Sequence, residues 1–80
     1  MTIPLIQGEF SYNDAMDLIT QMIHIKIKYH KNKIAGTENE EEVKSLEAKI
    51  IQFQKELFEA RNKIKAKKGA IKINSIINIE

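Results

Sequence analysis

The side chains that could carry out chemistry are few and stand far apart along the chain. His24 and His30 are the only imidazoles, and there is no cysteine. Six residues apart on a helix, the two histidines would point about 240° away from each other, so one metal ion could not bind both. Without cysteine no disulfide can form. The residues therefore predict no metal site and no cofactor.

Nucleophilic and phosphate chemistry lack their motifs as well. The serines do not have the flanking glycines of a nucleophile elbow, and the glycines are too far apart for a loop that binds phosphate. The residues concerned are Ser11, Ser45, Ser75, Gly8, Gly36 and Gly69. We therefore expect that the protein is not an enzyme.

Charged side chains gather in two stretches of opposite sign. Residues 37–60 hold seven acids against three lysines, and four of these acids lie at 38–42, where they complement the positive end of a helix. Residues 61–80 hold six cations against Glu80 alone, which gives a net charge of +5. The cations are candidate contacts for phosphate or for an acidic partner, and they are Arg61, Lys63, Lys65, Lys67, Lys68 and Lys72. A solvated face is the simpler interpretation, because the cluster has one arginine and no aromatic side chain for base stacking.

The elements that hold these residues follow a simple order. Apolar periodicity and the turn residues predict a strand at 2–7, a helix at 11–35, a turn at 36–37, a helix at 38–68 and a strand at 70–79. The expected fold is mainly α, a long antiparallel helical hairpin resembling a coiled coil. Short N- and C-terminal β-strands flank it in the order strand-helix-helix-strand. We expect residues 1–80 to form a single domain.

Capping residues mark the ends of both helices. Ser11 can accept a hydrogen bond from the amide of Asp14. Gly36 is expected in the left-handed conformation at the end of the first helix, and Thr37 is expected to cap the second helix in a capping box with Glu40. Gly69 is expected to end the second helix as Gly36 ends the first.

The second helix carries apolar residues three and four positions apart, from Val43 to Ile64, as in the seam of a coiled coil. A tight turn at 36–37 predicts that facing residues have numbers that add up to about 73. Ile19 should then face Phe53, and Lys26 should approach Glu47. The other expected pairs are Ile23 with Ile50, Met16 with Leu57, and Lys33 with Glu40.

Several apolar residues remain outside this seam, and a lone two-stranded ribbon is marginal in water. We therefore expect a homo-oligomer, most simply a dimer, or another protein partner. Whether the terminal strands pair within one chain or between chains is left open. The candidate interface residues are Leu18, Ile25, Ile51 and Phe58 on the helices, and Ile71, Ile73, Ile77 and Ile79 on the last strand.

The sequence also predicts a location and a class of function. No run of about 18 uncharged apolar residues occurs, so a membrane span is not expected. The first ten residues contain no lysine or arginine and do not resemble a signal peptide, which favours the cytoplasm. We expect a non-enzymatic protein interaction or structural module that associates through its helical faces. The alternative is a nucleic-acid-associated regulator that uses the basic cluster at 61–72.

Overall fold

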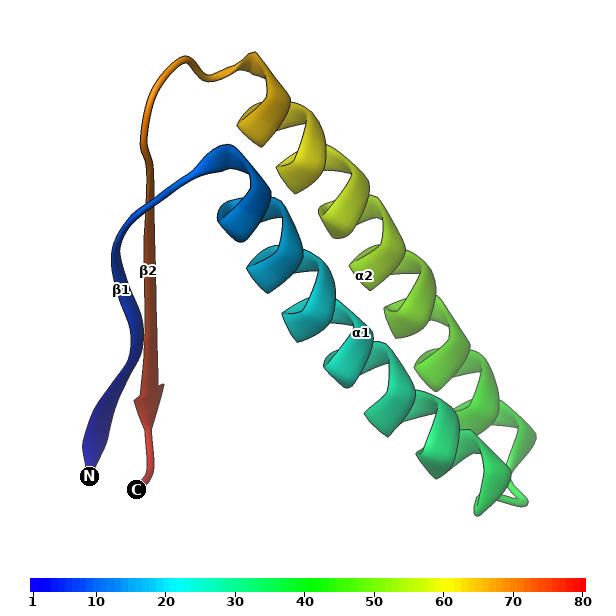
Figure 1. The fold of residues 1–80 in the computed structure, drawn as a ribbon. Helices are drawn as coiled ribbons and strands as arrows, with labels where there is room; N and C mark the ends of the chain where they lie inside the picture. The colour runs from blue at the N-terminus through cyan, green and yellow to red at the C-terminus, as the bar shows by residue number, and fades with distance from the viewer.

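The computed structural model describes all 80 residues and confirms the order strand-helix-helix-strand (Figure 1). The elements are β1 (Thr2–Phe10), α1 (Tyr12–Ala35), α2 (Glu40–Ala66) and β2 (Ile71–Asn78). The two helices lie side by side as a hairpin, and the two strands pair as an antiparallel ribbon. Both strands differ slightly from the predicted ranges, since β1 continues to Phe10 and β2 is one residue shorter at each end.

The start of α1 is as predicted, but its end is not. Ser11 caps the helix, and its Oγ accepts a hydrogen bond from the Asp14 amide at 3.2 Å. Gly36 has φ −98°, so the left-handed conformation expected there is wrong. Instead the Gly36 amide donates to the Lys33 carbonyl at 3.2 Å, which tightens the last turn, and the Thr37 hydroxyl donates to the same carbonyl at 2.7 Å.

The N-cap of α2 is Asn39, and the predicted capping box of Thr37 with Glu40 is wrong. The Asn39 side-chain oxygen accepts from the amides of Glu41 at 2.9 Å and Glu42 at 3.2 Å. The Thr37 hydroxyl is already bonded to α1, and Asn39 is at least as good an N-cap as threonine. The turn therefore covers residues 36–39, and α2 begins two residues later than predicted.

The end of α2 also comes two residues early. The helix ends at Ala66, and Lys67 is already extended with ψ 142°. Gly69 does have a positive φ of 91°, but it lies in the connection to β2 and is not the cap of the helix. A positive φ is a conformation that favours glycine over other residues.

The register between the helices differs from the prediction. Ala15 and Ile64 are buried in one cluster, and Ile19 lines a pocket together with Ala60. In both pairs the residue numbers add up to about 79, not 73. The longer turn raises the expected sum by about two. The remaining difference of about four residues equals about one helical turn. Because seam residues recur every three or four positions, a shift of one turn keeps the apolar faces together.

The predicted charge pairs near the turn are likewise wrong. The Lys26 Nζ lies 4.2 Å from the centre of the Phe53 ring, and the His30 ring lies 4.9 Å from the same ring, edge to face. The Lys33 Nζ lies 4.8 Å from the centre of the Tyr29 ring. These lysines therefore contact aromatic faces, which attract cations, in place of the expected carboxylates.

The ribbon keeps one apolar face because of a β-bulge in β1. Pro4 pairs with Ile76 and Ile6 pairs with Ser75, so Leu5 is the additional residue in β1. Without the bulge, Ile3 and Ile6 would point to opposite faces, because side chains alternate along a strand. With it, four cross-strand pairs share the face that meets the helices, namely Phe10 with Ile71, Gly8 with Ile73, Ile6 with Ser75, and Ile3 with Ile77.

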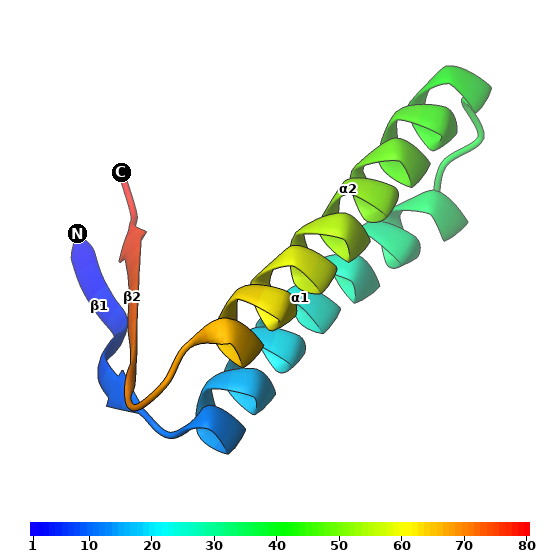
Figure 2. The same ribbon diagram turned by 90° about the horizontal axis from the view of Figure 1, so that it is seen from above.

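The ribbon and the helical hairpin meet at one end only, and together they form an open V (Figures 1 and 2). Ile27, Leu46 and Ile50 are buried within the hairpin, and the rest of the core lies at this junction, where Ala15, Ile64 and Ile71 are buried. Phe10, Met16, Ile19 and Ile73 pack around them. Both chain termini lie at the free end of the ribbon, which stands away from both helices. We call this free half, residues 1–6 and 75–80, the ribbon tip.

Candidate interaction surfaces

The chain exposes far more surface than a compact protein of its mass. Its accessible area is 6336 Å², whereas a compact monomer of 9.2 kDa exposes about 4,900 Å². Its radius of gyration is 15.2 Å, against about 12 Å for a compact domain of 80 residues. Only 6 of the 80 residues are buried, and none of the large side chains is fully buried. The isolated chain therefore has a small core and a large uncovered surface.

An apolar stripe runs along α1 on a face about 90° around the helix from the seam residue Ile19. Leu18 and Met22 are half-buried, whereas Ile25 is 68% exposed and Tyr29 is 57% exposed. These residues follow each other at spacings of three and four, so they lie on one face of the helix. The sequence identified Leu18 and Ile25, and the structure adds Met22 and Tyr29. The same spacing rule could have found both, had it been applied to this second face.

A smaller apolar area lies on α2. Ile51 is 55% exposed and Phe58 is 67% exposed, one above the other at a spacing of seven. Ala60 lines the pocket that faces β2, and Phe58 is about 160° from Ala60 around the helix. Phe58 therefore points away from the ribbon. The two helical stripes, both identified from the sequence, do not form one continuous face.

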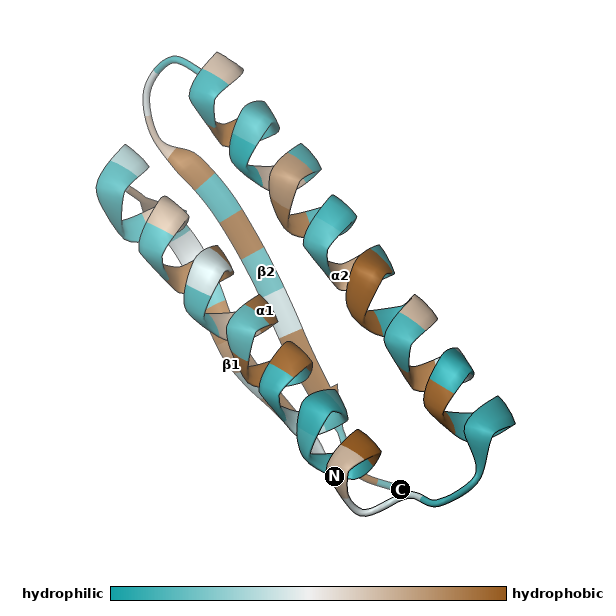
Figure 3. Cartoon of the chain, turned by 90° about the vertical axis from the view of Figure 1, so that its right-hand side faces the viewer, coloured by the Kyte–Doolittle hydropathy of each residue, from teal (hydrophilic) through white to brown (hydrophobic).

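The candidate residues on β2 divide into two groups. Ile71 is only 5% exposed and Ile73 is half-buried, and both pack in the core of their own chain. Their side chains are therefore covered within their own chain, because the strand lies against the junction of the helices there. Ile77 and Ile79, by contrast, are exposed at the ribbon tip. In Figure 3 brown and teal alternate along β2 where it faces the helices.

The ribbon tip is apolar on both faces. Ile3 and Ile77 lie on the inner face, Ile76 lies on the outer face at 54% exposure, and Leu5 at the bulge is 50% exposed. Apart from the chain termini, Glu80 is its only charged group. The other half of the ribbon is different, because its outer face carries polar cross-strand pairs such as Glu9 with Lys72. Leu5 and Ile76 were not predicted. The bulge that places Leu5 leaves no signal in the sequence, whereas the alternation along β2 is enough to put Ile76 on the face opposite to Ile77.

The basic cluster is split between two places. Lys63, Lys67 and Lys72 surround a pocket of about 310 Å³ in the angle of the V. Its apolar lining is Ile19, Ala60, Ile64, Ile71 and Ile73. Arg61 and Lys65 lie beside Phe58 on another side of α2, and Lys68 is exposed in the connection to β2. The six cations therefore do not form one flat phosphate-binding face.

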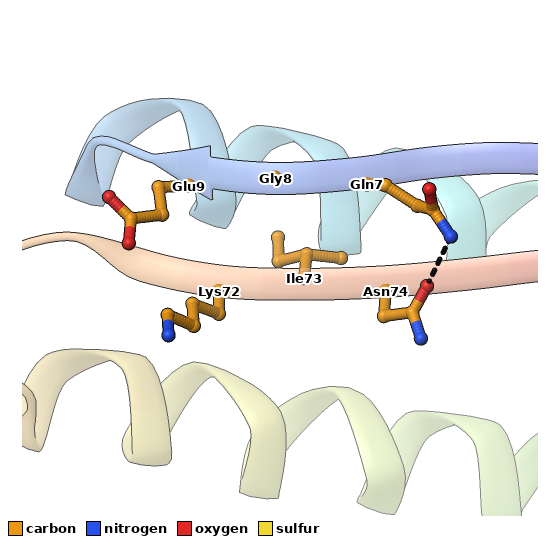
Figure 4. A pocket seen from close by; sticks show the side chains of 6 residues that line it. All are labelled: Gln7, Gly8, Glu9, Lys72, Ile73 and Asn74. Carbon is orange, nitrogen blue, oxygen red and sulfur yellow. Dashed lines mark hydrogen bonds between the residues drawn. The ribbon is translucent and has the colours of Figure 1, made fainter.

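A second hollow, of about 340 Å³, lies along the ribbon around Gly8 (Figure 4). Gln7 and Asn74 join across the strands, with the Gln7 Nε2 donating to the Asn74 Oδ1 at 3.1 Å. Glu9 and Lys72 line the other end. The lining holds no nucleophile beside a base, so we assign this hollow no chemistry.

Two further observations concern metals and membranes. The structure contains no group of three or more histidine, cysteine, aspartate or glutamate side chains arranged to hold a metal ion. Neither helix combines the length and the hydropathy that crossing a membrane requires.

Comparison of the chain with protein-family models, curated proteins and solved structures gives no match. Its function must therefore be argued from its surfaces.

Proposed function

We propose that the protein is a non-enzymatic interaction module that works as a homodimer and associates through its exposed apolar helical faces. The observation that carries this proposal is the excess surface, because the chain exposes about 1,400 Å² more than a compact monomer of its mass. A standard protein interface covers about 800 Å² on each partner. The excess is thus large enough for a stable dimer.

The α1 stripe is the helical surface that we assign to the dimer. It is the longer of the two stripes, and its four residues span about three helical turns. The pair Ile51 and Phe58 points away from the ribbon and is available to a further protein partner. Since the chain lacks cysteine, we keep the cytoplasm as the proposed compartment.

Substitution of Ile25 tests this assignment. In a twofold dimer each substitution acts twice, and the loss of one buried isoleucine costs about 1.5–3 kcal/mol. Ile25→Lys should therefore raise the dimer dissociation constant at least about tenfold, which sedimentation equilibrium would measure. His24→Lys is the matched control, because this neighbouring residue is exposed and lies outside the stripe. Equal dissociation constants for the two variants would exclude the α1 stripe.

A second candidate function is carried by Lys63, Lys67 and Lys72, which gather around one pocket. Three cations in one place can bind the phosphates of a nucleic acid. This function predicts binding of a labelled duplex or single strand at about 50 mM salt, because contacts to phosphates are strong at low salt. The triple substitution of these lysines to glutamine should abolish that binding. No change in fluorescence anisotropy with the unmodified protein would remove this candidate.

A further inference from the structure

The two edges of the ribbon differ in their ability to accept another strand. Along β1 the outer edge is interrupted, because Pro4 has no amide hydrogen and Leu5 forms a bulge. Both features are known to protect edge strands from pairing. Along β2 the eight residues Ile71–Asn78 contain neither proline nor bulge. The β2 edge is therefore the open one.

The backbone groups that β2 presents at this edge can be identified. The N-terminal amine of Met1 donates to the Ile79 carbonyl, and the Ile79 amide donates to the Met1 carbonyl, both at 2.6 Å. Because backbone groups of successive strand residues point to opposite edges, Ile77 also bonds toward β1. The amides and carbonyls of Ile76 and Asn78 are then directed outward. They lie in the ribbon tip, which has no helix beside it.

We propose that two copies of this chain pair through their β2 edges, antiparallel, in a four-stranded sheet with the order β1-β2-β2-β1 and a twofold axis at Ser75. This inference rests on the proposed homodimer and adds a second contact, between strands, to the helical contact assigned to the α1 stripe. A ribbon of two strands is marginal in water, whereas three or more strands with an apolar face are stable. The partner is a second copy because the edge is self-complementary and the excess area fits a dimer.

The register at Ser75 follows from the side chains. Residues 71–79 are centred on residue 75, so pairing there uses the whole edge. Ile73 then lies opposite the Ile77 of the other copy, and Ile71 lies opposite Ile79. β-branched residues facing each other across strands stabilise a sheet. Lys72 lies opposite Asn78, so no two like charges face each other. The apolar inner faces of both ribbons also lie on the same side of the sheet, where the helices are.

Single cysteines test this register, because the natural chain has none. Ser75 would form a non-hydrogen-bonded pair with its copy, with Cα atoms about 4.5 Å apart, a distance that a disulfide can bridge. Ser75→Cys should therefore oxidise to a covalent dimer about 100-fold faster than a cysteine that meets its copy only by collision. Ser45→Cys is the matched control, since it makes the same chemical change at an exposed site on α2. Ile25→Cys and Phe58→Cys test in the same way whether either helical stripe meets its copy in the dimer.

The outcomes separate this inference from the proposed function. Rapid cross-linking of Ser75→Cys, with slow cross-linking of Ser45→Cys, supports pairing of the β2 edges. If the protein is a dimer by sedimentation but Ser75→Cys reacts no faster than Ser45→Cys, edge pairing is wrong and the proposed dimer stands. Fast reaction of Ile25→Cys or Phe58→Cys alone would then place the contact on the helices. A monomeric protein would overturn both proposals.

Discussion

Asn39 shows how a single side chain sets the length of the turn between the helices. Its side-chain oxygen accepts from the amides of Glu41 and Glu42. Thr37 stands two residues earlier and matches the sequence pattern of a capping box with Glu40, but its hydroxyl bonds to the Lys33 carbonyl. Two good capping residues so close together could not be ranked from the sequence, because the choice depends on where α1 ends.

Removal of this cap should destabilise the protein measurably. Asn39→Ala leaves two helix amides without their acceptor, and the free energy of unfolding should fall by about 1 kcal/mol. Thr37→Ala should cost less, because it removes only one exposed hydrogen bond. Urea unfolding followed by circular dichroism gives both values at one protein concentration. A larger loss for Thr37→Ala would show that Thr37 is the cap after all.

Substitution by alanine should have different effects on stability at Gly8 and at Gly36. Gly8 has φ 137°, so alanine there should cost about 1–3 kcal/mol in backbone strain, although open space surrounds the site. Gly36 has φ −98°, and the nearest atom to an added Cβ is the Lys33 carbonyl oxygen at 3.9 Å. Gly36→Ala should therefore be neutral or stabilising by up to about 1 kcal/mol. The same urea titration measures both, and a strong loss at Gly36 would contradict its conformation.

At the scale of elements, the sequence predicts what forms but not how the elements are aligned. Ser11 marked the start of α1, and the alternating isoleucines marked β2. The seam of α2 repeats every three or four residues, so a slide of one turn keeps it in contact, and the register of the hairpin cannot be derived from the pattern alone. The bulge at Leu5 was also beyond prediction, because Thr2–Gln7 satisfies the strand pattern with or without it.

The edge of β2 makes its own prediction for hydrogen exchange. The amides of Ile77 and Ile79 bond toward β1, whereas those of Ile76 and Asn78 are directed outward. In a paired sheet all four should be protected from exchange. In an isolated ribbon only the amides of Ile77 and Ile79 should be protected, so slow and fast exchange would alternate along the strand. Exchange measured by NMR residue by residue distinguishes these cases, and fast exchange at Ile76 and Asn78 in the dimer would contradict edge pairing.

At the scale of the whole molecule, the open V explains why so little of the chain is buried. The hairpin and the ribbon touch only at their junction, and the molecule extends over 47 × 32 × 13 Å. The homodimer that we propose would give such a chain the additional buried surface that it lacks alone. Of the predicted interface residues, Ile25, Ile51 and Phe58 are exposed, whereas Ile71 is buried because the strand packs on its own helices there.

The claim that the protein is a homodimer is central, and sedimentation equilibrium of the unmodified chain tests it most directly. Across protein concentrations from about 1 to 100 μM, which cover the affinities of standard interfaces, we predict a single species of about 18 kDa, twice the 9.2 kDa of the chain. A mass that stays at 9.2 kDa over this whole range would contradict the account.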